Sequence, residues 1–598
     1  MKFPLSPKLR KNTAALCAAL SVMSCIAGPA EIAMASAYTI QQESSITILP
    51  INNAKFVAGQ KFDFMIEVKN AKANDIMVTI NGKTADKFFG KAATVAMNGT
   101  IATYRIDQVS VNKAGTIDIA VQANGNSRQV QYDVVADKAG KRAKNVILYV
   151  GDGMSLQARE IARILSKGIT EGKYNDLLEM EKLSNMAIVT TSGYDSIVTD
   201  SANSASAYAT GQKGVVNSMG IYADSTKDPF DDPKVENIVE LVKRSRGMAT
   251  GLVSTSNITD ATPAAMISHT RRRAEQNFIA EDMFADYHRP DVILGGGSRH
   301  FLPMSTPGSK RKDGQDVIAQ FEGAGYAFSG TKSELTATPS GTKKLLGLYN
   351  LDNLNVYVDR EMLKNPKTLG GFNDQPGLVD MTQTAIDSLS NNKNGFFLMV
   401  EGACIDKQLH MMDWQRAAYD NIELDKAVKV GRDFADKNND TLIIVVADHA
   451  HGASITGTYH EKDGKTGREA VRTYAAAGYP TFEDRDGDGY PDNPNPDVTL
   501  AVQFASHPDV NLDYRFKAEP TAPAIMANGK AIANPKLKGE FSPGTIPAKE
   551  SQEVHAADDV ILNAYGPGAD YFKGVMDNTE VFFGMVRALG LDATKNSK

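Results

Sequence analysis

Asn145-Val-Ile-Leu-Tyr-Val150 is a near-continuous apolar run, and a run of this kind indicates a strand that is buried on both of its faces. Similar runs occur at Gly395-Phe-Phe-Leu-Met-Val400, at Thr441-Leu-Ile-Ile-Val-Val446 and, more weakly, at Ala249–Thr255 and Asp291–Leu294. Helical stretches such as Glu423–Lys437 separate the runs. The pattern therefore predicts an α/β fold in which a central, mostly parallel sheet is sandwiched by helices.

Metal-capable side chains follow three of these runs. Asp152 comes just after the first run, Glu401 follows Val400, and the pair Asp448-His449 comes just after Val446. Ligands of open α/β sheets bind beyond the carboxyl ends of the strands. We therefore expect these side chains to meet in one region.

Asp406 and His410 stand four residues apart, shortly after Glu401. On a helix this spacing places both side chains on one face, where they can bind one metal ion. An isolated pair of this kind is more often an ordinary surface feature, but here it follows a buried strand. Carboxylates with imidazoles suit zinc, whereas carboxylates with a hydroxyl group suit magnesium. The sequence thus predicts a metal site at this end of the sheet.

The segment that begins at Ser201 supplies a candidate nucleophile. Small residues from Ser201 to Thr210 predict a closely packed helix that ends at Gly211. Ser201 would then lie in the first turn, where free N–H groups and the helix dipole favour an anion. The alternative is that Asp200 or Ser201 is only the helix N-cap. Because no Gly-x-Ser-x-Gly motif is present, activation by a metal ion is the expected route for this hydroxyl.

Residues 1–37 indicate export. A basic start is followed by an apolar run from Thr13 to Ala27, and small residues then precede a cleavage site after Ala37. Lipidation of Cys25 is an alternative, since Val22-Met-Ser-Cys25 loosely resembles a bacterial lipobox. We expect a periplasmic or secreted protein with no transmembrane domain in the mature chain.

Residues 38–137 alternate between apolar and polar side chains, as in Phe62-Asp-Phe-Met-Ile-Glu-Val68. Asn81-Gly82 and Asn124-Gly125 mark hairpin turns. These short strands predict a small, immunoglobulin-like β-sandwich domain in front of the α/β domain, which would span residues 145–598. The segment contains no histidine or cysteine. A spacer or surface-binding role is expected for it, with a partner that the sequence does not identify.

The composition excludes several classes of protein. The chain has 598 residues, of which 42% are hydrophobic and 23% charged, as in ordinary soluble globular proteins. Its net charge is −6 and it has no long basic run outside the N-terminus, so no nucleic-acid-binding role is expected. Two of the three cysteines lie within residues 1–37, and the third, Cys404, would be a packed thiol without a disulfide partner.

The motifs and their order resemble those of the alkaline phosphatase family. The matching segments are Val150–Met154, Thr199–Ser201, Thr259–Ala265 with His269, Glu401–Lys407 with His410, Ala447–His451 and Glu553–His555. They cover most of residues 145–598, and a series of this length in the family's order is hard to produce by chance. The resemblance implies a bacterial-type alkaline phosphatase with an extra N-terminal β-domain.

The resemblance also implies two zinc ions and one magnesium ion for each subunit. It assigns Asp406, His410 and His555 to one zinc, and Asp152, Asp448 and His449 to the other. It assigns the magnesium to Asp152, Thr262 and Glu401, with Asp260 reaching it through water. His451 would lie behind the zinc ligands.

The implied reaction is hydrolysis of small phosphate monoesters to an alcohol and inorganic phosphate through a phosphoserine intermediate. Ser201 would be the nucleophile, Lys407 would contact phosphate through water, and Arg273 would bind phosphate directly. Arg271 and Arg272 adjoin Arg273, and a guanidinium group suits phosphate whichever of the three supplies it. A homodimer is implied as well. The competing hypotheses are a phosphodiesterase or sulfatase of the same superfamily, and an exported binding protein without activity.

Residues 453–550 form an insertion whose middle does not align with the family. It contains Asp484-Arg-Asp-Gly-Asp-Gly-Tyr-Pro-Asp492, which begins like a calcium-binding loop. Asn495 stands where a complete EF-hand loop has glutamate. Structural calcium and a polar acidic turn are therefore equal alternatives, and the insertion could cover the mouth of the active site or affect a subunit interface.

Overall fold

The computed structural model describes residues 45–136, 142–460, 462–465, 479–480, 483–494, 497–506, 515–518, 524–533, 540–543 and 550–596. The predicted signal peptide, with its cleavage and lipidation sites, lies outside the described residues, and so does Asn495. Among the described residues we find no helix with the length and hydropathy needed to cross a membrane.

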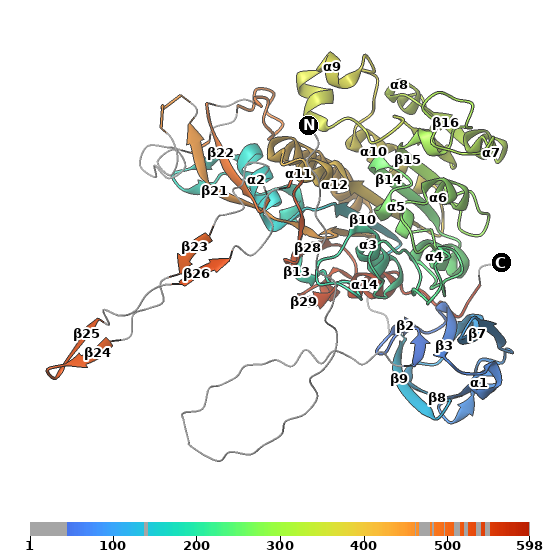
Figure 1. Ribbon diagram of the computed structural model, residues 1–598. Coiled ribbons are helices and arrows are strands. Elements are labelled where there is room, and N and C mark those ends of the chain that lie inside the picture. Colours follow the sequence, from blue (N-terminus) through green and yellow to red (C-terminus); the bar gives the residue numbers. More distant parts are fainter. Residues whose placement is uncertain are drawn as a thin grey trace, which may run out of the picture. The chain divides into compact units, whose positions relative to one another are not determined.

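A ten-stranded sheet forms the centre of the larger domain (Figure 1). In spatial order its strands are β16 (Ala327–Ser329), β17 (Leu345–Leu348), β15 (Val292–Gly296), β14 (Ala249–Asn257), β18 (Phe396–Gly402), β10 (Asn145–Gly151), β19 (Thr441–Ala447), β28 (Val560–Tyr565), β13 (Asn185–Thr190) and β29 (Gly574–Asp577). Only β28 runs antiparallel to its neighbours in this sheet. The predicted α/β fold with a mostly parallel sheet is confirmed.

The three strongest apolar runs of the sequence lie side by side as β18, β10 and β19. Every residue of these strands is buried, because helices pack on both faces of the sheet (Figure 1). One group consists of α2 (Leu156–Lys167), α10 (Leu378–Leu389) and α12 (Trp414–Asn438). The other consists of α3 (Ser201–Thr210), α4 (Ile238–Arg246), α5 (Ala261–Ala265) and α14 (Glu580–Leu589).

Helix α3 has the bounds that its small residues predict. Asp200 is its N-cap and accepts a hydrogen bond from the N–H of Asn203, while Gly211 ends it in the left-handed region at φ 74°. All ten of its residues are buried, since serine and alanine allow the helix to approach the sheet closely. Tyr208 donates a hydrogen bond to the carbonyl oxygen of Ala447, which fixes the helix against the end of β19.

The N-terminal domain consists of two sheets with a shared apolar core. One sheet contains β1 (Ile46–Leu49), β3 (Lys61–Lys69), β7 (Ile101–Ser110) and β6 (Thr94–Asn98), and the other contains β2 (Lys55–Val57), β9 (Asn126–Val135), β8 (Gly115–Ala123), β4 (Met77–Ile80) and β5 (Lys83–Thr84). A short helix, α1 (Ala85–Phe89), follows β5. The arrangement agrees with the expected two-layer β-domain.

The start of β3 joins the β-domain to the larger domain. Phe62 pairs with Val235 in an antiparallel bridge, and the N–H of Asp63 donates to the carbonyl oxygen of Lys234. Gln60 is completely buried and donates from Nε2 to the carbonyl oxygen of Thr210, at 2.9 Å. The β-domain thereby contacts the C-terminal end of helix α3.

The described part of the insertion contains a hairpin and an acidic turn. Strands β21 (Ala453–His460) and β22 (Val498–Phe504) pair in antiparallel fashion. Two further pairs follow, β23 (Arg515–Ala518) with β26 (Glu540–Pro543) and β24 (Ala524–Ala527) with β25 (Lys530–Ala533). In the turn, the buried Tyr490 donates to Asp425 of α12 at 2.9 Å. This contact fastens the acidic turn to the helix layer.

Candidate active site

Three neighbouring strands deliver acidic side chains to one edge of the sheet. Asp152 follows β10, Glu401 lies near the end of β18, and Asp448 follows β19, and all three are at most 2% exposed. The chain after β10 turns at Gly153 with φ 64°, and a Cβ atom there would lie 2.6 Å from the His451 ring. Glycine is therefore required where the turn approaches the site.

Asp152, Asp448 and His449 form a first group, which we call the Asp152 cluster. His449 Nε2 lies 3.3 Å from Asp152 Oδ1 and 3.5 Å from Asp448 Oδ2. Ser201, the first residue of α3, points its hydroxyl into this group, with Oγ 3.2 Å from His449 Nε2 and 3.4 Å from Asp152 Oδ1. The buried Asp448 Oδ2 has no hydrogen-bond partner.

Asp406, His410, His451 and His555 form a second group, the Asp406 cluster. Helix α11 (Cys404–His410) realises the predicted spacing, with His410 Nε2 3.3 Å from Asp406 Oδ1. His555 arrives from the far end of the chain because β20 (Ala450–His451) pairs with β27 (His555–Ala556). Its Nε2 lies 3.5 Å from Asp406 Oδ1.

Hydrogen bonds to carbonyl oxygens fix the orientation of two imidazoles in the Asp406 cluster. His410 Nδ1 lies 2.7 Å from the carbonyl oxygen of Glu553, and His555 Nδ1 lies 2.9 Å from that of Thr199. Since a carbonyl oxygen only accepts, each Nδ1 carries a hydrogen, and in the neutral imidazole each Nε2 then presents a lone pair. The two Nε2 atoms face each other at 3.1 Å. Two facing lone pairs beside a carboxylate fit a bound cation, and this donor set suits zinc.

His451 has a different role in the same cluster. Its Nε2 lies 2.5 Å from Asp406 Oδ1, so the imidazole donates to the carboxylate that the other two histidines surround. Burial lowers the pKa of His451 to about 4, and the ring is neutral at physiological pH. It therefore orients the Asp406 carboxylate.

Two further oxygen donors lie at buried positions, one on helix α5 and one on strand β18. Thr262 of α5 has a buried Oγ1 without a hydrogen-bond partner. Glu401 accepts a hydrogen bond from Ser254 of β14, a residue that the sequence analysis did not single out. Burial and the charge of Asp152 raise the pKa of Glu401 well above its usual range. Carboxylates and a free hydroxyl are the donors that fit magnesium.

Lys407 joins these groups electrostatically. Its Nζ lies 3.3 Å from Asp406 Oδ2, 3.3 Å from Asp260 Oδ2 and 3.7 Å from Asp152 Oδ2. Burial alone would lower the pKa of Lys407, but these carboxylates outweigh it and raise that pKa well above its usual range. The site therefore contains more buried carboxylates than this lysine and Arg273 can neutralise, which favours bound cations.

Arg273 is the arginine that reaches the site. Its guanidinium lies 2.9 Å from Asp260 Oδ1 and 3.4 Å from Asp200 Oδ2, next to Ser201. Arg271 instead donates to the carbonyl oxygens of Asp224 and Thr226, and Arg272 is exposed. The alternative that a neighbouring arginine takes this place is therefore not supported by the geometry.

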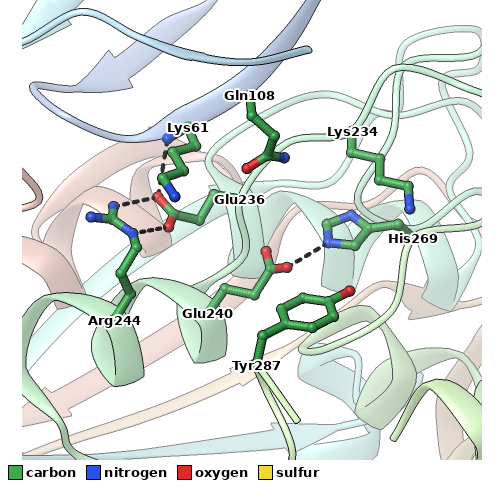
Figure 2. Close-up of a pocket in the computed structure, with 8 residues that line it drawn as sticks. All are labelled: Lys61, Gln108, Lys234, Glu236, Glu240, Arg244, His269 and Tyr287. Atoms are coloured by element: carbon green, nitrogen blue, oxygen red, sulfur yellow. Dashed lines mark hydrogen bonds and ion pairs between the residues drawn. The ribbon is translucent and has the colours of Figure 1, made fainter. Parts of the chain in front are cut away.

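Two residues from the matching motifs do not belong to the metal-capable clusters of the described residues. His269 lies 3.1 Å from Glu240 and lines a separate pocket of about 460 Å³, shown in Figure 2. Cys404 is buried, with Sγ 3.6 Å from the carbonyl oxygen of Thr255. In the insertion, Asp484, Asp486 and Asp488 are exposed and have oxygen atoms within 4.8 Å of one another. This geometry is compatible with structural calcium and equally with a polar acidic turn.

The family model for alkaline phosphatase matches residues 143–591. The chain belongs to the alkaline phosphatase family. Alkaline phosphatase 3 of Bacillus subtilis (strain 168) is 31% identical over 474 residues, which is 76% of this chain and 91% of the relative. Alkaline phosphatase of Escherichia coli (strain K12) is 29% identical over 519 residues, or 80% of this chain and 93% of the relative.

Solved alkaline phosphatases share the fold. The enzyme from the Antarctic bacterium TAB5 has a TM-score of 0.52 at 24% identity, covering 75% of this chain and 99% of that one. The enzyme from Thermus thermophilus has a TM-score of 0.54 at 24% identity, covering 76% and 93%. The predicted family is confirmed, and with it hydrolysis of phosphate monoesters by a metal-dependent enzyme. The N-terminal β-domain precedes the matched residues.

Proposed function

We propose that this alkaline phosphatase works in two steps through a phosphoserine at Ser201. The observation that carries the proposal is the position of the Ser201 hydroxyl, within 3.4 Å of both His449 Nε2 and Asp152 Oδ1. Ser201 is 2% exposed and opens helix α3, where unpaired N–H groups stabilise negative charge on oxygen. Asp200 is the N-cap, which leaves the Ser201 hydroxyl available for chemistry.

We further propose zinc at the Asp152 cluster, zinc at the Asp406 cluster, and magnesium between Thr262, Glu401, Asp152 and, through water, Asp260. The facing lone pairs of His410 and His555 and the unpartnered Asp448 Oδ2 and Thr262 Oγ1 support this assignment. When bound, these cations would supply positive charge for developing oxyanions and lower the pKa of the serine hydroxyl and of water.

In the first step the Ser201 oxygen forms a bond to phosphorus and the bond from phosphorus to the ester oxygen breaks. The hydroxyl proton of Ser201 passes to solvent water, and the departing alkoxide takes up a proton from solvent and leaves as the alcohol. In the second step a water oxygen attacks the phosphoserine, inorganic phosphate departs, and Ser201 regains its proton. In both steps negative charge develops on the leaving oxygen, while the three nonbridging oxygens share the charge of the transferred group.

Arg273 binds the nonbridging oxygens in this scheme. Its guanidinium presents two parallel N–H groups, a geometry that matches phosphate. Asp200 and Asp260 form ion pairs with this guanidinium, so it is oriented before substrate arrives. Lys407, which the surrounding carboxylates keep protonated, contributes positive charge to the phosphate through a bridging water.

Substrate comparison tests the reaction class. The full chain is loaded with zinc and magnesium, and turnover of an aryl monophosphate, a diaryl phosphate and an aryl sulfate is measured in parallel. We expect the monophosphate to be turned over fastest. Dominant diesterase or sulfatase activity would contradict the proposal, in which the cationic Arg273 and Lys407 bind a doubly charged phosphoryl group.

Acid quenching tests the intermediate. Enzyme mixed with ³²P-labelled monoester is quenched at low pH, where a phosphoserine is stable, and is digested for peptide mapping. Label on the peptide that contains Ser201 is the expected result. Label on another residue, or turnover without any labelled protein, would require direct attack by water instead.

We also propose that the enzyme is exported to the periplasm or secreted, and that it forms a homodimer. Residues 1–37 support export, and membership of the family is consistent with a dimer. The N-terminal sequence of the purified mature protein should begin at Tyr38. A lipidated N-terminus at Cys25 would identify a membrane-anchored form, and light scattering gives the oligomeric state.

A further inference from the structure

A third group of acidic side chains lies outside the active site, between α3 and α4. Asp224, Asp231 and Asp232 have oxygen atoms within 4.8 Å of one another, and we call them the loop cluster. Asp224 and Asp232 are only 7% and 1% exposed, whereas Asp231 faces solvent. None of the three takes part in the reaction described above.

The loop itself orients these carboxylates. The N–H of Asp224 donates to Asp232 Oδ1 at 2.9 Å, and the N–H of Thr226 donates to Asp224 Oδ1 at 2.7 Å. The Thr226 hydroxyl donates to Asp231 Oδ1 at 2.8 Å. The remaining oxygen of Asp232, Oδ2, is buried and has no hydrogen-bond partner. A buried acceptor of this kind needs a donor or a cation.

The charges around the loop cluster do not balance. Glu67 of β3 is buried beside Ser225 and adds a fourth carboxylate. Two arginines are near: Arg105 donates to the carbonyl oxygen of Asp231 but pairs with Asp63 and Asp107, and Arg271 approaches no closer than 3.9 Å to Asp224 Oδ1 and 3.8 Å to Asp232 Oδ1. Its guanidinium is engaged with main-chain carbonyl oxygens of the loop. Burial, reinforced by the charges of Asp224 and Asp231, raises the pKa of Asp232 to about 6.

We propose that the loop cluster binds one calcium ion through Asp224, Asp231 and Asp232. The donors are all oxygens, and calcium accepts several carboxylates at once while water fills its remaining positions. The exposed Asp231 gives water access to the site. Both zinc sites proposed above include histidine nitrogen, a donor that this cluster lacks, and magnesium is usually held by one or two carboxylates.

The site would connect the two domains. Ser225 bonds through its N–H to Glu67 of β3, and the N–H of Lys234, two residues after Asp232, donates to Asp63 of the same strand. Arg105 of β7 donates to the carbonyl oxygen of Asp231. Calcium therefore stabilises the loop that carries the contacts to the β-domain, and its binding should raise the thermal stability of the whole chain.

The test is calcium binding to the full chain with zinc and magnesium present in excess, so that the active site is occupied. Isothermal titration calorimetry counts the calcium ions, and differential scanning fluorimetry follows the melting temperature. Every protein compared, including the reference, carries Asp486→Asn. This change keeps calcium bound at the exposed acidic turn of the insertion out of the number of ions counted. We expect one calcium ion per chain and a rise in melting temperature of about 3 °C at saturating calcium.

Asp232→Asn should abolish both the calcium equivalent and the melting shift, because it removes the charge and keeps the shape. Asp228→Asn is the matched control, since Asp228 lies in the same loop but outside the cluster. If Asp232→Asn does not fold, the exposed Asp231→Asn serves instead and should weaken calcium binding by at least about tenfold. Equal calcium binding by these variants and the control overturns the proposal, as does magnesium displacing calcium at equal concentration.

Discussion

The Ser201 hydroxyl is the group on which turnover depends in the proposed reaction. We expect Ser201→Ala to lower turnover of an aryl monophosphate by at least about 10³-fold, because it removes the hydroxyl that lies beside His449 and Asp152. The metal content, measured by mass spectrometry, should stay the same. Ser184→Ala is the control, since that hydroxyl is exposed and bonds only Asn185. Near-normal turnover by Ser201→Ala would remove Ser201 as nucleophile.

Arg273 should determine how tightly the enzyme binds the phosphoryl group. Truncation to alanine removes a charge-assisted pair of hydrogen bonds, and we expect inhibition by inorganic phosphate to weaken by roughly 10- to 100-fold. Arg273→Lys keeps the charge but lacks the planar guanidinium. Its inhibition constant for inorganic phosphate should lie between those of the unchanged protein and Arg273→Ala. Arg272→Ala is exposed and serves as the control. An unchanged inhibition constant in Arg273→Ala would mean that another group binds phosphate.

His288 makes stability depend on pH. It is buried, with Nε2 3.5 Å from Asp282 Oδ1 and Nδ1 3.7 Å from Glu240 Oε1. Glu240 also pairs with His269, and the Tyr287 ring packs on His288. Burial opposes protonation, but the two carboxylates raise the pKa of His288 to about 9. The unfolded value is about 6.5.

Because the folded pKa is the higher one, the stabilisation by protonated His288 is complete below about pH 6.5 and is lost as the pH rises through about 9. The shift corresponds to about 3 kcal/mol. Urea unfolding at about pH 7 and about pH 10 should therefore show a loss of that order, and His288→Gln should lose less over the same interval. If the unfolding free energy falls equally between these pH values in the unchanged protein and in His288→Gln, His288 is not a source of the pH dependence.

At the level of helices and strands, the elements that carry their own pattern were predictable. Buried runs gave β10, β18 and β19, and small residues followed by Gly211 gave α3. Asp406 and His410 were predictable as a pair because a helix brings them together locally. The position of His555 came only from the family resemblance, since the bond from its Nδ1 to Thr199 links segments 356 residues apart. Local periodicity contains no information about such a contact.

The contact between the β-domain and the larger domain could not be predicted from the sequence either. It leads to a prediction for Gln60, just before β3. Gln60 donates to the carbonyl oxygens of Thr210 and Glu236 and accepts from the N–H of Val57. Gln60→Leu leaves these buried groups unpaired, so we expect it to lower the free energy of unfolding by about 2–4 kcal/mol. Gln108→Leu, at an exposed position in the β-domain, should change it by less than about 0.5 kcal/mol.

Urea unfolding measures both values, and monoesterase activity shows whether the change reaches the nucleophile. Thr210 is the last residue of helix α3 and Ser201 is its first. If Gln60→Leu loosens the C-terminal end of this helix, turnover should also fall modestly. If Gln60→Leu is as stable as the Gln108 control, the contact between β-domain and helix does not contribute to folding.

Across the whole molecule, the stability of the described chain rests on packing and charge neutralisation. Cys404 is the free cysteine of the described residues, and burial raises the pKa of its thiol far above the usual range. The Asp152 and Asp406 clusters, with Glu401 and Asp260, place many carboxylates in one buried region. In an apolar environment these charges repel one another unless cations are bound.

Removal of the metals should therefore destabilise the protein as well as inactivate it. After dialysis against a chelator we expect loss of monoesterase activity and a fall in melting temperature of at least about 5 °C, because bound ligands stabilise only the folded state. Zinc together with magnesium should restore both properties. A phosphine reductant, which opens disulfides, should leave the melting temperature unchanged, since no disulfide joins the described residues. A melting temperature that chelation leaves unaltered would show that the buried carboxylates are neutralised by protons and by Lys407 and Arg273 alone.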